Sequence, residues 1–115
     1  MLKKQKNDER LATERDSDYQ VGVFAYTGSG KVVLVTSRKG ESWILPKGHR
    51  AKKRSDRLQA KREAFEEAGI QGSLNCKHYD FNCFEKSKQL RIYTMRVKTI
   101  LNDFPEVRQR KRMVT

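Results

Sequence analysis

The chain has 115 residues, of which 36% are hydrophobic, and its formal net charge is +12. A chain of this length makes one small domain around a single hydrophobic core, and we expect no second domain. No apolar run approaches the length of a membrane span, and the chain starts with charged residues instead of a hydrophobic signal segment. We therefore expect a cytoplasmic protein that has no membrane partner.

Residues 1–18 carry five basic and five acidic side chains and little apolar area, so we expect this segment to be charged and flexible. The domain itself is expected to span residues 19–115. Residues 19–26 alternate between two faces and predict a strand, and the glycines at 28 and 30 predict a hairpin turn. The Val-rich residues 31–37 are expected to form the partner strand, followed by a loop and a short strand at residues 43–45.

A helix is expected from about Asp56 to Ala68. Ser55 is a good N-cap residue, and Gly69 stands where a left-handed residue commonly ends a helix. Leu58 and Phe65 offer apolar area for packing. Small side chains recur at a spacing of four and form a ridge that can approach a sheet closely: Ala60, Ala64 and Ala68.

Two further strands are expected at residues 73–84 and 89–99. The aromatic side chains of Trp43, Phe84 and Tyr93 are expected in the core. Cys76 and Cys83 are expected to be reduced thiols, because two cysteines without a secretory signal seldom form a disulfide.

Three glutamates of the expected helix lie within a narrow arc of one face, because successive helical residues turn by about 100°. They are Glu63, Glu66 and Glu67. Carboxylates this close repel one another unless a cation lies between them, and hard oxygen ligands suit Mg²⁺ or Mn²⁺. The alternative is a solvated acidic helix face.

The stretch from Gly48 to Ile70 resembles the Nudix box, a pattern of Gly, five residues, Glu, seven residues, Arg-Glu, an apolar residue, any residue, Glu-Glu, any residue, Gly and an apolar residue. The residues in register are Gly48, Arg62, Glu63, Ala64, Glu66, Glu67, Gly69 and Ile70. A match of this length and spacing is highly specific. The resemblance implies an α+β fold, a Nudix-type α/β/α sandwich with a central mixed sheet and the box helix packed on it. It also implies a hydrolase that acts on acid anhydrides in phosphorus-containing compounds.

In enzymes of this family, water attacks a phosphorus atom of a diphosphate linkage with the help of a divalent metal ion. The resemblance implies that Gly48, through its backbone carbonyl, and Glu63, Glu66 and Glu67 bind Mg²⁺ or Mn²⁺. It also implies that Glu66 or Glu67 is the general base. Arg62 has the planar donor fork that orients a carboxylate, and a structural ion pair within the helix is its alternative role.

One position departs from the box, because Arg54 stands where the family has its first Glu. Arg54 is then expected to lie near Arg62 as a like charge. In one hypothesis Arg54 contacts a substrate phosphate, or Asp56 takes over the role of the missing carboxylate. In the other hypothesis hydrolysis is weakened, and the chain is a Nudix-fold module that binds RNA or a phosphorylated ligand through its basic rim.

Positive charge is concentrated around the proposed site. Residues 38–62 carry ten basic and two acidic side chains, a net charge of +8. This basic rim is expected to attract a polyanionic phosphorylated small molecule, with Lys47, Arg50 and Arg54 in contact with its phosphates. The candidate substrates are nucleoside diphosphate derivatives, dinucleoside polyphosphates and diphosphoinositol polyphosphates. Weak nucleic-acid binding is the other use of such a rim, and the resemblance leaves a homodimer open because Nudix relatives are often dimers.

The tail after Phe104 resembles the region that in relatives precedes a closing C-terminal helix. Glu85 and Glu106 are candidates for an additional catalytic carboxylate. The basic side chains of the tail are expected either to form a solvated surface or to contact phosphate. They are Arg108, Arg110, Lys111 and Arg112.

Overall fold

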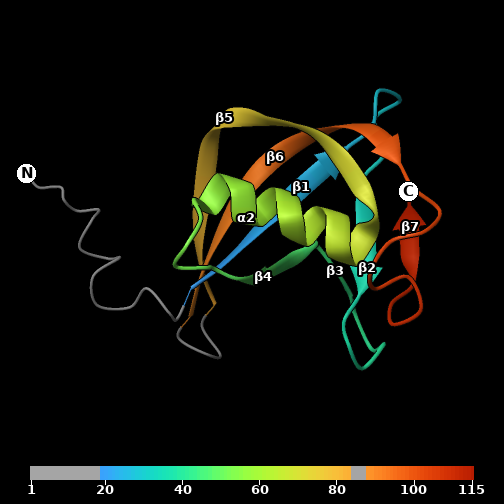
Figure 1. Cartoon of the computed structure of the whole chain (residues 1–115), viewed down its shortest axis with the longest axis horizontal. Helices are drawn as coiled ribbons and strands as arrows, with labels where there is room; N and C mark the ends of the chain where they lie inside the picture. Colours follow the sequence, from blue (N-terminus) through green and yellow to red (C-terminus); the bar gives the residue numbers. More distant parts are fainter. Residues whose placement is uncertain (1–18, 84–87) are drawn as a thin grey trace, which may run out of the picture.

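A four-stranded mixed sheet forms the centre of the computed structural model, which describes residues 19–83 and 88–115 (Figure 1). Its strand order is β4-β1-β6-β5; β1 and β6 are parallel and the other pairs are antiparallel. The strands are β1 (Gln20–Tyr26), β4 (Lys47–His49), β5 (Ile70–Cys83) and β6 (Lys88–Ile100). The segment 1–18, which was predicted to be flexible, lies outside the described residues.

A smaller antiparallel sheet has the strand order β3-β2-β7. Its strands are β2 (Val33–Thr36), β3 (Trp43–Ile44) and β7 (Arg112–Val114). The predicted turn between β1 and β2 is present, with Gly30 at a φ of 83°, in the left-handed region that glycine adopts without strain. The bridge between Tyr26 and Val32 closes this hairpin.

The predicted helix is confirmed, but its last turn differs from the rest. The helix α2 (Asp56–Glu63) continues directly into a π-helical turn, η2 (Ala64–Ala68). Ser55 accepts a hydrogen bond from the backbone N–H of Leu58, as an N-cap residue does. Gly69 adopts the expected left-handed conformation at a φ of 65°, and its N–H donates to the carbonyls of Ala64 and Phe65. The bond to Ala64 spans five residues, and such π-helical turns are frequent at functional sites.

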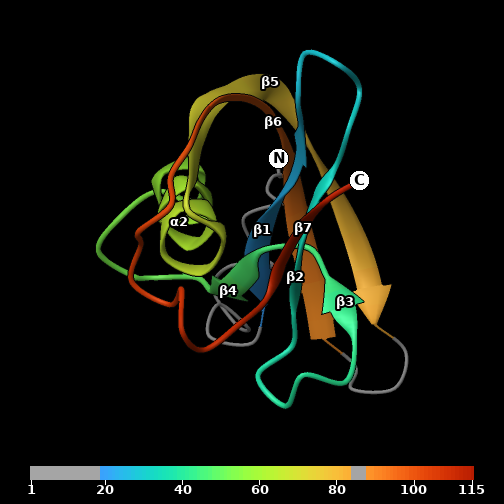
Figure 2. The same ribbon diagram turned by 90° about the vertical axis from the view of Figure 1, so that its right-hand side faces the viewer.

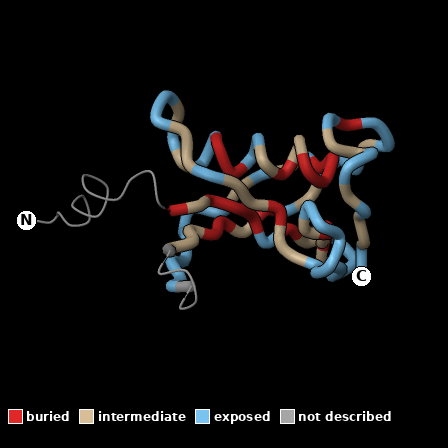
Figure 3. Tube along the Cα trace, turned by 90° about the horizontal axis from the view of Figure 1, so that it is seen from below, coloured by how far each residue is buried: buried red, intermediate tan, exposed pale blue. Residues whose placement is uncertain are grey.

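The helix packs closely on one side of β1 and β6, as Figure 2 shows by looking along α2. The predicted alanine ridge is fully buried, and so are the residues of β1 that point toward it. These are Ala60, Ala64 and Ala68 on the helix, and Val21, Val23 and Ala25 on the strand. In Figure 3 the buried stretches of the chain face one another between helix and sheet. Small side chains on both surfaces therefore hold the helix backbone, and the glutamates it carries, close to the sheet.

Two expectations about packing were wrong. Leu58 is 58% exposed, because it lies two residues and about 200° around the helix from Ala60. Trp43 is 46% exposed instead of buried, since the two-residue strand β3 is the edge of the small sheet. Tyr93 is buried as predicted, whereas Phe84 lies outside the described residues.

Two short strands were not predicted. The segment Lys47–His49 lies outside the predicted strands, but it forms β4 and pairs with β1. The segment Arg112–Val114 was treated as a charged tail, but it forms β7 and pairs with β2. Residues 105–109 form turns, and no helix follows Gly69 in the part of the chain that the structure describes. Strands this short carry too little periodicity to be distinguished from loops by sequence alone.

None of the helical segments within residues 19–83 and 88–115 combines the length and the apolar character required to cross a bilayer. The thiol of Cys76 is free, as predicted.

Candidate functional site

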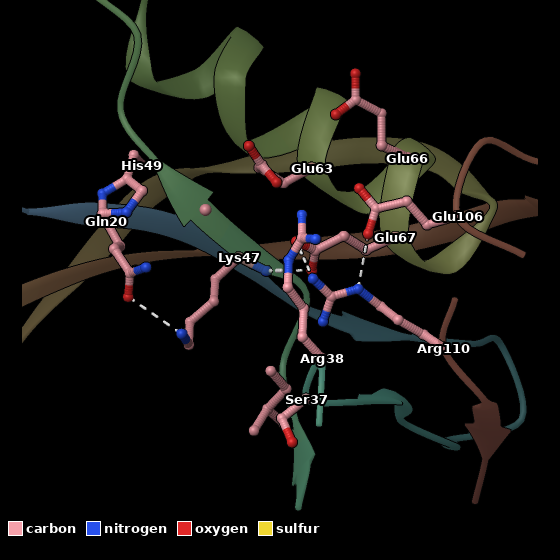
Figure 4. A pocket seen from close by; sticks show the side chains of 12 residues that line it. Gln20, Ser37, Arg38, Lys47, His49, Glu63, Glu66, Glu67, Glu106 and Arg110 are labelled. Atoms are coloured by element: carbon pink, nitrogen blue, oxygen red, sulfur yellow. Dashed lines mark hydrogen bonds and ion pairs between the residues drawn. The ribbon is translucent and has the colours of Figure 1, made fainter. Parts of the chain in front are cut away.

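A cleft of about 620 Å³ opens where η2, β4, the end of β2 and the segment before β7 meet (Figure 4). Four glutamates line it together with several basic and polar side chains. The lining residues are Gln20, Ser37, Arg38, Ile44, Lys47, Gly48, His49, Glu63, Glu66, Glu67, Glu106 and Arg110. The three glutamates predicted from the box are thus in one cleft, and Glu106 from the tail joins them.

Glu67 is the most buried of these four glutamates, with 4% of the residue exposed. Its Oε1 accepts a hydrogen bond of 3.1 Å from the backbone N–H of Lys47, and its Oε2 lies 3.3 Å from Nη2 of Arg110. Burial raises the pKa of Glu67 to about 7, although the Lys47 N–H and the Arg110 charge both lower it. The negative charges of Glu63 and Glu106 raise it further. The carboxyl therefore titrates near neutral pH while two donors fix its orientation.

Glu63 is held from two sides. Nε2 of Gln59 donates to its Oε2 over 2.6 Å, and a Cβ added to Gly48 would overlap its carboxylate. Burial raises its pKa, and the charges of Glu66 and Glu106 act in the same direction. The position of the Glu63 carboxylate thus depends on residue 48 having no side chain.

We expect Gly48→Ala to displace the Glu63 carboxylate and to weaken divalent-metal binding about tenfold or more. The check is a titration of the metal-free protein with Mn²⁺. Gly28→Ala is the matched control, because a Cβ at Gly28 meets its nearest neighbour, Arg96, at an ordinary 3.7 Å. Equal Mn²⁺ affinity in the two variants would contradict this role of Gly48.

Glu66 is oriented by the box arginine. Nε of Arg62 lies 2.9 Å from Oε2 of Glu66, one helical turn along the chain. The backbone carbonyl of Glu66 accepts a hydrogen bond of 2.9 Å from the N–H of Glu106, which ties η2 to the tail. Arg62 therefore engages a carboxylate of the cleft, in the same geometry as an ordinary helical ion pair.

The tail provides two residues of the cleft, Glu106 and Arg110. The Arg110 side chain is 6% exposed; its Nε lies 2.8 Å from Glu106 and its Nη1 donates to the carbonyl of Thr36. Arg112 also turns inward and donates to the carbonyls of Ala68 and Leu101. The expectation of a solvated basic tail is therefore wrong for Arg110 and Arg112. The spacing of four residues between Glu106 and Arg110 is the sequence signal that could have indicated their pairing, while Glu85 lies outside the described residues.

Of the three residues of the basic rim that were expected to contact phosphate, Lys47, Arg50 and Arg54, only Lys47 lines the cleft, where its Nζ donates to Gln20 over 3.1 Å. Arg50 instead lies against the Tyr19 ring, with its Nε 3.7 Å from Asp56. Arg54 donates to Gln59. Two side chains that were not singled out, Arg38 and His49, take part in the lining.

Asp56 was expected as a possible substitute for the missing box carboxylate, but it does not line the cleft. It accepts hydrogen bonds from Tyr19 at 2.7 Å and from Arg91 at 3.2 Å. This carboxylate therefore stabilises the start of α2 against the sheet.

The residues of the cleft fit a hard divalent cation. Four glutamate carboxylates and Gly48 line the cleft, and oxygen donors of this kind are those that Mg²⁺ and Mn²⁺ prefer. Burial is the main cause of the raised pKa values of Glu63 and Glu67, and the charges of neighbouring carboxylates add to it. Within the described ranges, no three acidic, histidine or cysteine side chains already stand as a complete chelating group.

The raised pKa of Glu67 has a consequence for stability. The protonated Glu67 carboxyl holds its proton more tightly in the folded protein than in the unfolded chain. This difference adds to the free energy of unfolding at pH values below the ordinary glutamate pKa. The added stability is lost as the pH rises through about 7. We expect the melting temperature of the metal-free protein to fall between pH 5 and pH 8. The fall should be smaller in Glu67→Gln, and identical slopes in the two proteins would contradict the assignment.

A mixed sheet that carries a short helix, with clustered glutamates beside a cleft of about 620 Å³, is the arrangement expected of the Nudix fold. A NUDIX domain model matches residues 17–111, and the chain belongs to the NUDIX family. Proteins of similar fold include one described as a NUDIX hydrolase and one described as a pyrophosphohydrolase. The predicted family, the α+β class and the mixed sheet with its packed helix are thereby confirmed.

Three solved structures illustrate the similarity. A NUDIX hydrolase from Nitrosomonas europaea has a TM-score of 0.70 and 20% identity, over 86% of this chain and 57% of that one. The Bacillus subtilis pyrophosphohydrolase BsRppH, solved as a mutant, has a TM-score of 0.68 and 22% identity, over 87% and 63%. A structure from a study of MutT from Aliivibrio salmonicida and Vibrio cholerae has a TM-score of 0.62 and 16% identity, over 85% and 76%. The chain thus spans about three fifths of the length of the first two, and no curated protein matches it significantly.

Proposed function

We propose that this chain is a metal-dependent pyrophosphohydrolase that cleaves a diphosphate linkage in a polyanionic phosphorylated small molecule. The observation that carries this proposal is the cleft, in which four glutamates face basic side chains. Carboxylates alone would repel a polyphosphate, and basic residues alone would bind it without catalysis. Their combination in one cleft suits a substrate that arrives together with a cation.

Gly48, Glu63, Glu66 and Glu67 would hold Mg²⁺ or Mn²⁺. The bound ion would neutralise phosphate oxygens and lower the pKa of the attacking water.

Glu67 is the favoured proton acceptor for that water, with Glu66 as the alternative. The backbone N–H of Lys47 and the guanidinium of Arg110 hold the Glu67 carboxylate in a fixed orientation. In the metal-free protein its pKa is about 7, near the pH at which a general base works best. Arg62 orients Glu66 through their ion pair.

Basic side chains at the other side of the cleft would bind the phosphates of the substrate. Lys47 and Arg38 line the cleft directly, and the surrounding rim would raise the local concentration of a polyanion. Arg50 and Arg54 have other partners, so this role falls mainly to Lys47 and Arg38.

The substrate classes considered are nucleoside diphosphate derivatives, dinucleoside polyphosphates and diphosphoinositol polyphosphates. The similarity to a protein named as a pyrophosphohydrolase supports the reaction type at the level of the fold. The proposal extends to a single domain over residues 19–115 and a cytoplasmic location, both of which are sequence predictions. A homodimer stays a hypothesis.

The test is phosphate release from a panel of these compounds with Mg²⁺, with Mn²⁺ and with a chelator. We expect at least one compound to turn over only when a divalent metal is present. Salt-sensitive binding of RNA or of a panel compound, without turnover of any of them, would overturn the enzyme proposal in favour of a binding module.

A further inference from the structure

Arg54, which stands in place of the first Glu of the box, has a specific hydrogen-bond partner in the structure. Nη1 of Arg54, in the loop before α2, donates to Oε1 of Gln59 over 2.7 Å. Nε2 of the same Gln59 donates to Oε2 of Glu63 over 2.6 Å. Gln59 is 5% exposed, so its amide has little access to water and depends on these two partners. A continuous hydrogen-bond chain therefore links the loop to the Glu63 carboxylate.

The charges at the two ends determine the orientation of the Gln59 amide. Arginine can only donate hydrogen bonds, and the oxygen is the only acceptor of the Gln59 amide. The amide oxygen must therefore face Arg54 and the amide nitrogen must face Glu63. Arg54 thus acts on Glu63 without touching it, because it fixes which end of Gln59 is available to the carboxylate.

We propose that Arg54 and Gln59 form a positioning relay that holds the Glu63 carboxylate against the backbone of Gly48 for metal binding. This inference rests on the proposed function and deepens it, because it assigns a role in the site to the residue that breaks the box pattern. In this proposal Arg54 supports the site through Gln59 instead of contacting a phosphate. Second-layer hydrogen bonds of this kind orient metal-binding carboxylates and affect metal affinity.

The relay is tested by titrating the metal-free protein with Mn²⁺ alone and measuring free Mn²⁺ by electron paramagnetic resonance. Arg54→Ala and Gln59→Ala are each expected to weaken Mn²⁺ binding about tenfold. The double variant should be little worse than either single variant, because both remove the same relay. Lys53→Ala removes an equal charge from an exposed neighbouring position and should leave the Mn²⁺ affinity unchanged.

Restoring the residue of the family pattern gives the sharpest contrast. In Arg54→Glu, Gln59 would face two acceptors and its amide oxygen would lose its donor. We therefore expect Mn²⁺ binding to fall at least as far as in Arg54→Ala, whereas Arg54→Lys, which keeps a donor, should retain most of it. Half-maximal hydrolysis should need correspondingly more metal in Arg54→Glu, while the KM for the substrate stays the same.

Three results would overturn the relay: unchanged Mn²⁺ affinity in Arg54→Ala, losses that multiply in the double variant, or tighter binding in Arg54→Glu. Position 54 lies in a partly exposed loop, so its variants are expected to fold, and circular dichroism checks this. The Mn²⁺ titration requires no turnover. A failure of the relay is thus distinguishable from a failure of the proposed hydrolase activity, in which the native chain binds Mn²⁺ but hydrolyses nothing.

Discussion

Glu67→Gln is expected to lower the rate of diphosphate hydrolysis about a thousandfold, within the range that a general base contributes. The amide keeps the shape of the side chain but cannot accept a proton from water, and it is a poorer metal ligand. The measurement is kcat at saturating Mg²⁺ for the best compound of the panel, with thermal melting to confirm the fold.

Glu41→Gln is the matched control for this variant. Glu41 is an exposed carboxylate in the loop before β3 and does not line the cleft. The Glu41→Gln variant should therefore retain the native rate of hydrolysis. If Glu67→Gln also retained more than about a third of the native kcat, Glu67 would have no part in the chemistry and the proton acceptor would have to be sought at Glu66.

Arg110→Met is expected to destabilise the protein by about 3–5 kcal/mol at pH 8, because it leaves buried carboxylates without their counter-charge. The native guanidinium lies within 3.3 Å of Glu67 and 2.8 Å of Glu106, and the side chains of Arg110 and Glu67 are both almost fully buried. The loss is measured by urea unfolding of the metal-free protein. Arg108→Met, at an exposed position two residues earlier, should have little effect.

The pH dependence separates the charge of Arg110 from its packing. Below its pKa of about 7, Glu67 carries a proton in the folded protein and has less need of a positive partner. The destabilisation by Arg110→Met should therefore be smaller at pH 5 than at pH 8. Equal losses at the two pH values would show that Arg110 stabilises the fold through packing alone.

The helix and its glutamates could be predicted because several independent signals agree along one short stretch. Ser55 and Gly69 define its ends, the alanine ridge defines the buried face, and the box spacing places Glu63, Glu66 and Glu67 together. All of these signals are local, so the sequence contains them without knowledge of the fold.

The remainder of the site depends on contacts between distant parts of the chain. Arg110 reaches Glu67 across 43 positions and Thr36 across 74. A basic residue in a charged tail has the same local sequence whether it is solvated or buried against carboxylates. The π-helical turn was also unpredictable, because it arises from how the end of the helix meets its surroundings and not from the propensity of its residues.

Arg54 illustrates the same point within the box itself. Its charge predicted repulsion from Arg62 or contact with a phosphate, and neither prediction took Gln59 into account. Gln59 is not part of the motif, yet its amide accepts a hydrogen bond from Arg54 and donates one to the Glu63 carboxylate.

The most direct test of the proposed hydrolase is ³¹P NMR of the reaction in water enriched in ¹⁸O, with Mg²⁺ and the diphosphate-containing compounds. We expect two phosphorylated products, one of which carries a single ¹⁸O on phosphorus, and no reaction when the metal is chelated. Compounds that stay intact with Mg²⁺ and with Mn²⁺, at protein concentrations where they bind, would contradict it.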